Sequence, residues 1–293
     1  MRAVGTILQA LSNWMGPHLM LQRSTEPGRL TFIGHSTVLL EIAGTRLITD
    51  PVLGHVMGSL RRHAPPVSGI RLQGIDVVFI SHGHFDHLDL PSLRSLPGLP
   101  AVVVPRGLGR VAASAHLGVV HEVAPGDRIW IGDIDFDIVA AAHGRHRLPW
   151  VAGVAAIGCI ASGAGIGVYF AGDTDVFPEM AGLAGRVDVA LLPIGGWGPR
   201  LGGGHMDPER AAAATAMIRP AVAVPIHWGT LSPWGMRRFA GPAFGAPGLA
   251  FEEAVGRLAP AVRTLVLAPG ESMPLGVLPD ATPPVPLSAP VAK

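Results

Sequence analysis

One short stretch constrains this chain more than any other: residues 81–89, which read Ser-His-Gly-His-Phe-Asp-His-Leu-Asp. This His-x-His-x-Asp-His pattern follows the apolar, β-branched run 75–80, which is typical of a buried strand. Imidazole and carboxylate groups are ligands of zinc and related ions, and one loop here offers four of them: His82, His84, Asp86 and His87. Four specified positions should match by accident roughly once in a thousand such sequences, so a solvated polar turn after a strand is the less favoured alternative. The stretch therefore predicts a metal site at the end of a strand.

Further candidate ligands come at the ends of other predicted strands. His143, Asp173 and His227 each directly follow a run that reads as a strand. A parallel or mixed sheet could bring all three to one edge, where sites in α/β proteins commonly lie. Together with the loop they predict two ions bridged by Asp173, with three further ligands each: His82, His84 and His143 for the first ion, and Asp86, His87 and His227 for the second.

Composition favours one compact domain without a dedicated nucleic-acid surface. The 293 residues are 48% hydrophobic and 15% charged, which is ample material for a core. The formal net charge is +1 and Lys293 is the only lysine, so we expect no nucleic-acid partner. The single Cys159 excludes an internal disulfide and suits a reducing compartment, so we expect a cytoplasmic location.

Two segments raise the question of a membrane. Apolar residues recur at helical spacing in the first twenty positions: Leu8, Leu11, Trp14, Met15 and Leu19. They predict a helix packed on the domain, with a helix lying on a membrane surface as the alternative. The segment 151–172 carries no charge, but its glycines and the turn-like 162–165 predict two buried strands rather than a span.

The remaining pattern predicts two packed sheets covered by helices. Ala43-Gly44 reads as a hairpin turn between strands 38–42 and 46–49. Asp207 as N-cap followed by Pro208 predicts a helix over 208–218. The expected organisation is a helical segment 1–27, a domain 28–270 and a Pro-rich tail 271–293. Further strands are expected near 30–33, 76–80, 101–104, 128–131, 133–139, 151–160, 167–171, 187–192, 222–226 and 262–267, and further helices near 90–97, 107–117 and 249–258.

These motifs, in this order, resemble the metallo-β-lactamase-fold hydrolases. The resemblance extends to the branch that contains N-acylphosphatidylethanolamine-hydrolysing phospholipase D and ascorbate-phosphate lactonase-like proteins. It rests on Gly34 to Thr37, Thr49 to Pro51, Arg62, Pro65-Pro66, Ser81 to Asp89, His143 with Arg147, Phe170 to Thr174, Leu191 to Gly195, His205 to Glu209 and Pro225 to Thr230.

The resemblance implies an αββα sandwich of two mixed sheets and a dinuclear site for zinc, with manganese or iron as alternatives. Two ions would lower the pKa of a shared water towards about 7, and Asp86 would orient the resulting hydroxide. His35 and Asp50 would hold ligand tautomers by hydrogen bonds from behind. His205 would contact substrate or protonate the leaving group, or serve only as a structural cap. The family spacing, with Arg147 four residues on, favours His143 over His146 as ligand.

For function, the resemblance implies a phosphodiesterase of the phospholipase D type. The alternatives are a lactone or other ester hydrolase on the same metal centre and a non-catalytic metal-binding protein, and the complete ligand set argues against the latter. The substrate is expected to be a small or lipid-like phosphodiester, with peripheral membrane contact as an option; the oligomeric state stays open. Residues expected to bind substrate are Arg62, Trp197 and Arg200.

Overall fold

Two seven-stranded mixed sheets lie face to face in the computed structural model, which describes residues 28–64, 69–144, 153–196, 201–235, 241–276 and 278. The first sheet contains β1 (Arg29–Gly34), β2 (Thr37–Ile42), β3 (Thr45–Thr49), β6 (Val77–Phe79), β7 (Ala101–Pro105), β8 (Val120–Val123) and β17 (Ser272–Pro274). The second contains β9 (Arg128–Ile131), β10 (Ile134–Ala140), β11 (Ile157–Gly163), β12 (Ile166–Phe170), β13 (Val189–Pro193), β14 (Val222–Ile226) and β16 (Arg263–Thr264). The strand orders are β17-β1-β2-β3-β6-β7-β8 and β16-β14-β13-β12-β11-β10-β9.

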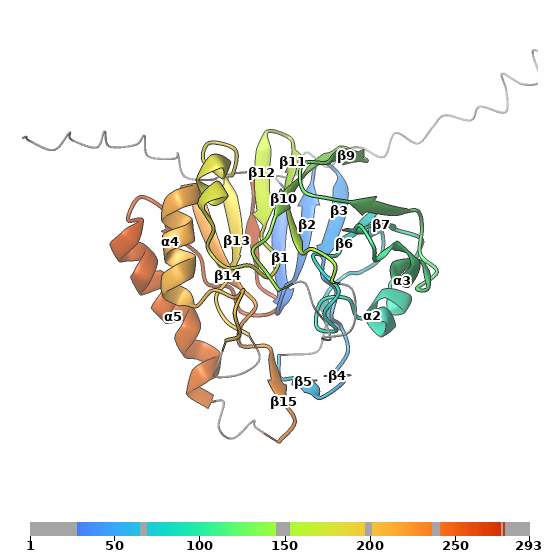
Figure 1. Ribbon diagram of the computed structural model, residues 1–293, viewed down its shortest axis with the longest axis horizontal. Helices are drawn as coiled ribbons and strands as arrows, with labels where there is room; N and C mark the ends of the chain where they lie inside the picture. Colours follow the sequence, from blue (N-terminus) through green and yellow to red (C-terminus); the bar gives the residue numbers. More distant parts are fainter. Residues whose placement is uncertain are drawn as a thin grey trace, which may run out of the picture.

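Helices cover both outer faces, which confirms the predicted αββα sandwich (Figure 1). The short helices α2 (Leu90–Ser95) and α3 (Gly109–Ala113) pack on the first sheet. The second sheet is covered by η2 (Pro178–Leu183), α4 (Pro208–Ile218) and α5 (Gly241–Leu258). As predicted, Asp207 caps α4: its side chain accepts a hydrogen bond from the backbone N–H of Arg210.

The main core lies between the sheets. Phe79 of the first sheet meets Phe136 and Phe170 of the second, with ring centroids 6.4 and 6.0 Å apart. Neighbouring residues of one strand point to opposite faces of the sheet: Leu40 packs in this core, whereas Leu39 packs against the helices that cover the first sheet. Because these strands are buried on both faces, they read as continuous apolar runs, and each large side chain contributes about 1.5–3 kcal/mol.

Each sheet combines an antiparallel part with a parallel part. β3, β6, β7 and β8 are parallel in the first sheet, as are β12, β13, β14 and β16 in the second. The carboxyl ends of β3, β6, β12 and β14 are followed within three residues by Asp50, Ser81, Asp173 and His227, respectively. A small third sheet of β4 (Val56–Met57), β5 (Leu60–Arg62) and β15 (Leu231–Pro233) was not predicted.

Some predicted boundaries differ from the structure. The uncharged segment does split at Ala164-Gly165, both with positive φ, but β11 begins at Ile157 rather than at 151. β17 lies within the stretch predicted as a tail, where it pairs antiparallel with β1. The predicted helical segment 1–27 lies outside the described residues. Within the part of the chain that the structure describes, no helix has the length and apolarity needed to cross a bilayer.

Candidate metal centre

The predicted ligands meet at one edge of the sandwich. Loops that follow strands of both sheets bring them together in two groups, the second of which also contains His35. Donor atoms lie within 4.8 Å of one another in each group: His82, His84, His143 and Asp173, and His35, Asp86, His87 and His227. A third group overlaps with these and consists of Asp50, His82 and His87. The arrangement agrees with the expectation that candidates at strand ends share one sheet edge. Their assignment as ligands stays a prediction.

In the first group three ring nitrogens face one another. His84 Nδ1 lies 2.9 Å from His82 Nε2 and 3.2 Å from His143 Nε2. Asp173 Oδ2 lies 3.8 Å from His82 Nε2. The group therefore offers three imidazole nitrogens and a carboxylate around one point, a donor set that suits zinc.

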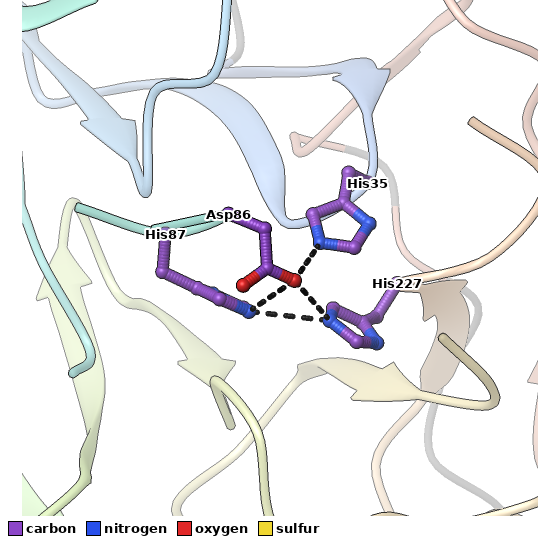
Figure 2. A group of neighbouring side chains, drawn as sticks. All are labelled: His35, Asp86, His87 and His227. Carbon is purple, nitrogen blue, oxygen red and sulfur yellow. Dashed lines mark hydrogen bonds and ion pairs between the residues drawn. The ribbon is translucent and has the colours of Figure 1, made fainter. Parts of the chain in front are cut away.

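The second group is centred on a carboxylate oxygen, as Figure 2 shows. Asp86 Oδ2 lies 3.7 Å from His87 Nε2, 3.8 Å from His227 Nε2 and 3.1 Å from His35 Nε2. The Nε2 atoms of His87 and His227 are 3.2 Å apart. His35, predicted to support ligands from behind, is thus itself in contact with Asp86.

Asp173 lies between the two groups. Its Oδ2 is 3.2 Å from His87 Nε2, and its Oδ1 is 3.2 Å from His227 Nε2. Together with the 3.8 Å approach of Oδ2 to His82, these contacts give the carboxylate neighbours in both groups. This is the position that a bridging ligand requires.

Hydrogen bonds behind the first group fix the tautomer of His82. Ser81 Oγ lies 2.6 Å from Asp50 Oδ2 and 2.9 Å from His82 Nδ1. A hydroxyl has one proton, and donating it to the Asp50 carboxylate leaves its oxygen to accept from His82 Nδ1–H. His82 Nε2 therefore turns an unprotonated lone pair towards the group, as a ligand must.

The other rings are oriented in the same way. Asp50 Oδ2 lies 2.7 Å from His87 Nδ1, and its role in holding a ligand from behind stays a prediction. The Nδ1 atoms of His143 and His227 each donate to a main-chain carbonyl at 2.8 Å, that of Gly204 and of Gly195 respectively. Each of these rings keeps Nε2 for the site.

Burial keeps the imidazoles of the first group unprotonated. Desolvation, reinforced by His87, holds the pKa of His82 well below its ordinary value. Desolvation and His143 lower the pKa of His84 to about 4, and desolvation also lowers the pKa of His143. At neutral pH all three rings are thus Lewis bases ready to bind a cation.

For Asp173, Asp86 and His87, neighbouring charged groups outweigh burial in setting the pKa. Burial would raise the pKa of Asp173, but His227 and His87 outweigh it and hold that pKa well below the ordinary value. Burial would also raise the pKa of Asp86, yet His87, His227 and His35 lower it. For His87, burial is outweighed by Asp173, Asp86 and Asp50, which raise its pKa well above the ordinary range. A divalent ion would displace that proton, since both compete for one lone pair.

The donor set fits divalent ions. Asp173 Oδ1 is buried and accepts no hydrogen bond from the described residues, although His227 Nε2 is 3.2 Å away. The ring proton of His227 is on Nδ1, where it is donated to Gly195. A buried carboxylate oxygen without a donor is costly unless a cation satisfies it.

His205 stands beside the centre rather than behind it. Its Nε2 lies 3.3 Å from Asp173 Oδ2, its Nδ1 lies 3.2 Å from Gly202 O, and its ring is 4.7 Å from that of His143. Burial would lower the pKa of His205, but the hydrogen bond to Asp173 raises it. The ring is half-buried and Asp207 supplies the helix cap, so a capping role for His205 is excluded.

Arg62, one of the three residues predicted to bind substrate, is buried and bonded to main-chain carbonyls. Arg62 is 5% exposed, and its guanidinium donates to the main-chain oxygens of Ile33 and Val52. Burial lowers its pKa to about 10. Substrate contact by Arg62 is thus unsupported, because its guanidinium is bonded to the backbone of β1 and of the segment after β3. Trp197 and Arg200 lie outside the described residues, as do His146 and Arg147.

Sequence reasoning did not assign roles to several supporting groups. Ser81 orients His82, Thr230 Oγ1 accepts from the His35 N–H at 2.7 Å, and the carbonyls of Gly195 and Gly204 orient two rings. Ser81 and Thr230 lie one and three residues from the predicted ligands His82 and His227, and this proximity in sequence could have pointed to them. Main-chain carbonyls carry no such signal, because every residue has one.

The comparisons with known proteins agree with this geometry. Residues 45–228 match the family described as Beta-lactamase superfamily domain. The chain belongs to this family, and with it to the metallo-β-lactamase-fold hydrolase superfamily. Among solved structures, Igni18, a metallo hydrolase from the archaeon Ignicoccus hospitalis, is similar with a TM-score of 0.64 and 25% identity; the similarity covers 84% of this chain and 97% of Igni18.

Relatives are similar over about 70% of this chain. A metal-dependent hydrolase of Aeropyrum pernix is 34% identical, over 69% of this chain and 83% of that protein. N-acyl-phosphatidylethanolamine-hydrolyzing phospholipase D 1 of Caenorhabditis elegans is 29% identical, over 68% of this chain and 63% of that protein. An uncharacterised protein of Mycobacterium tuberculosis is 35% identical over 70% of this chain, which spans 61% of that relative's length.

Proposed function

We propose that this chain is a phosphodiester hydrolase that binds two divalent ions, with zinc as the first candidate and manganese or iron as alternatives. The observation that carries the proposal is the Asp173 carboxylate between two groups of imidazole and carboxylate donors. The similarity to a phospholipase D that acts on N-acyl-phosphatidylethanolamine supports the phosphodiester as substrate class.

The first ion would be held by His82, His84 and His143, and the second by Asp86, His87 and His227, with Asp173 shared. When bound, such ions lower the pKa of water and neutralise charge on the attacked group. The protein contributes orientation, because each ring whose far nitrogen is hydrogen-bonded can present only one nitrogen to the centre. A pair of hard Lewis acids suits the spread negative charge of a transferring phosphoryl group.

We assign His205 to the substrate. It is half-buried, and it lies next to Asp173, where a bound substrate would meet the centre. The hydrogen bond to Gly202 O orients the ring so that Nε2 faces the centre. In this position Nε2–H can donate to a phosphoryl or leaving-group oxygen. The expected substrate is a small or lipid-like phosphodiester.

A substrate panel tests the proposed reaction. Bis-aryl phosphate, an N-acyl phosphatidylethanolamine, a sugar-phosphate lactone and a cephalosporin would be incubated with the protein loaded with zinc and, separately, with manganese. We expect turnover of at least one phosphodiester to exceed lactone and cephalosporin turnover by a wide margin. Efficient turnover of the lactone with both phosphodiesters untouched would contradict the proposal and favour an ester hydrolase.

Elemental analysis of protein purified without chelator is expected to find close to two divalent ions per chain. Chelation should lower the melting temperature, since ligand binding at one hundred times Kd stabilises by about 2.7 kcal/mol per site. A mass spectrum under native conditions would resolve species with no, one and two ions. Full activity in a chain shown to be free of metal would contradict the two-ion centre.

A further inference from the structure

His35 occupies a position that contacts two predicted ligands of the second ion at once. It lies in the turn between β1 and β2, is buried, and has a left-handed backbone with φ 57°. Its Nε2 is 3.1 Å from Asp86 Oδ2, and its main-chain oxygen accepts the backbone N–H of His227 at 2.8 Å. This one residue therefore touches Asp86 through its side chain and His227 through its backbone and also through its ring, whose centroid lies 4.0 Å from that of His227.

The surrounding contacts hold this turn independently of the imidazole. The His35 N–H donates to Thr230 Oγ1 at 2.7 Å, and Arg62 donates to the carbonyl of Ile33. Gly34 has φ +127°, and a Cβ there would lie 2.9 Å from Thr230 Cγ2. Only glycine allows the turn to approach so closely. These contacts hold the backbone at residue 35 without using its imidazole.

The carboxylate of Asp86 needs a partner that fixes its rotation. A carboxylate on a single side-chain bond can turn either oxygen towards an ion, and χ2 of Asp has broad preferences. The approach of His35 Nε2 selects Oδ2, the oxygen that also faces His87 and His227 (Figure 2). A donor at this place sets both the orientation of the carboxylate and its distance from the two rings.

We propose that His35 is the positioning residue of the second ion: its Nε2–H holds the Asp86 carboxylate while its backbone holds His227. The inference rests on the two-ion centre of the proposed function and is independent of the substrate. The imidazole of His35 contacts Asp86, His87 and His227 and none of the described His82, His84 and His143, so we expect its effect to fall on the second ion. Loss of the imidazole therefore acts on one ion of the pair.

A direct role as ligand is the competing arrangement. His35 Nε2 is grouped within 4.8 Å of the donor atoms of Asp86, His87 and His227, so four side chains could surround the ion. The two roles require different chemistry from residue 35. A hydrogen-bond donor can be an amide N–H, whereas a ligand must offer a lone pair comparable to that of imidazole.

Three variants separate these roles. His35→Ala removes the side chain, and His35→Gln keeps an N–H donor at about the reach of Nε2. His116→Gln is the matched control, because His116 is exposed, has φ 61° and lies away from the centre. Each variant would be titrated with zinc against a chromophoric chelator, analysed for ions per chain, and loaded with cobalt to record its visible spectrum.

We expect His35→Ala to bind the first ion normally and the second 10- to 100-fold more weakly, the usual effect of removing a partner behind a ligand. His35→Gln should recover most of the affinity, and His116→Gln should equal the unmodified chain. The cobalt spectrum of His35→Ala should lose the contribution of the second site alone.

Two ions bound by His35→Ala with unchanged affinity would overturn the inference and leave the proposed function intact. Equal losses in His35→Ala and His35→Gln would also overturn it, in favour of a direct ligand. One ion per unmodified chain would instead remove the two-ion premise. Should His35→Ala fail to fold, the affinity of His35→Gln for the second ion decides between the two roles.

Discussion

Replacing Asp86 by alanine is expected to lower kcat/KM about 1000-fold and to leave the fold intact. Its carboxylate has three imidazoles as neighbours, His35, His87 and His227, and makes no hydrogen bond to the backbone of the described residues. Removing it therefore disturbs the metal centre and no strand or helix. A loss of roughly 4 kcal/mol in transition-state stabilisation corresponds to that factor, which is in the range expected for a group that orients metal-activated water.

The measurement is kcat/KM on the best substrate of the panel, with circular dichroism and ion content recorded for the same samples. Asp135→Ala is the control, since Asp135 pairs with Arg128 near the surface of the second sheet, away from the centre. Exposed pairs of this kind contribute little to stability. Rates like those of the unmodified chain in a folded Asp86→Ala variant would show that another group positions the nucleophile.

Replacing Gly172 by alanine is expected to cost about 2–5 kcal/mol of unfolding free energy. Gly172 joins β12 to Asp173 with φ +59°, and a Cβ there would lie 2.5 Å from Ser81 Cβ. The backbone conformation costs about 1 kcal/mol or more for alanine, and overpacking typically adds about 1–3 kcal/mol. Displacing Ser81 would also break its bonds to Asp50 and His82, so weaker binding of the first ion should accompany the loss of stability.

Denaturant unfolding and zinc titration of Gly172→Ala would measure both effects. Gly165→Ala is matched to it, because Gly165 also has a positive φ, +80°, but nothing lies within 4 Å of a Cβ built there. Gly165→Ala should lose only the unfolding free energy that the positive φ costs alanine, about 1 kcal/mol, and its ion binding should be unchanged. Equal destabilisation of the two variants would contradict the role assigned to the contact with Ser81.

Signals in short stretches of sequence correctly predicted the elements that depend on neighbouring residues. The cap and proline at 207–208 predicted α4 with the bounds that the structure has, and the Ala43-Gly44 turn joins β2 to β3 as expected. Strand ends predicted where His143, Asp173 and His227 would meet, because parallel strands share an edge. These predictions needed only residues that are near in sequence, together with general rules of sheet topology.

Contacts between distant segments could not be predicted in this way. β4, β5 and β15 are two or three residues long and have no periodicity to recognise, and β15 pairs with β5 across a long stretch of chain. Arg62 was predicted to meet substrate because a guanidinium suits phosphate. The structure instead bonds it to the main-chain oxygens of Ile33 and Val52, which only the packing of β5 against β1 and the segment after β3 could reveal.

The division of the ligands between the sheets has a consequence beyond chemistry. His82, His84, Asp86 and His87 follow a strand of the first sheet, whereas His143, Asp173 and His227 follow strands of the second. These sheets come from almost separate portions of the chain, so ions bound as proposed would cross-link two layers that otherwise meet through side-chain packing. The ions would bind only when the two sheets are packed as in the folded structure. By mass action, their binding would raise the free energy needed to separate the sheets. Loading would thus make the two halves unfold as one cooperative unit.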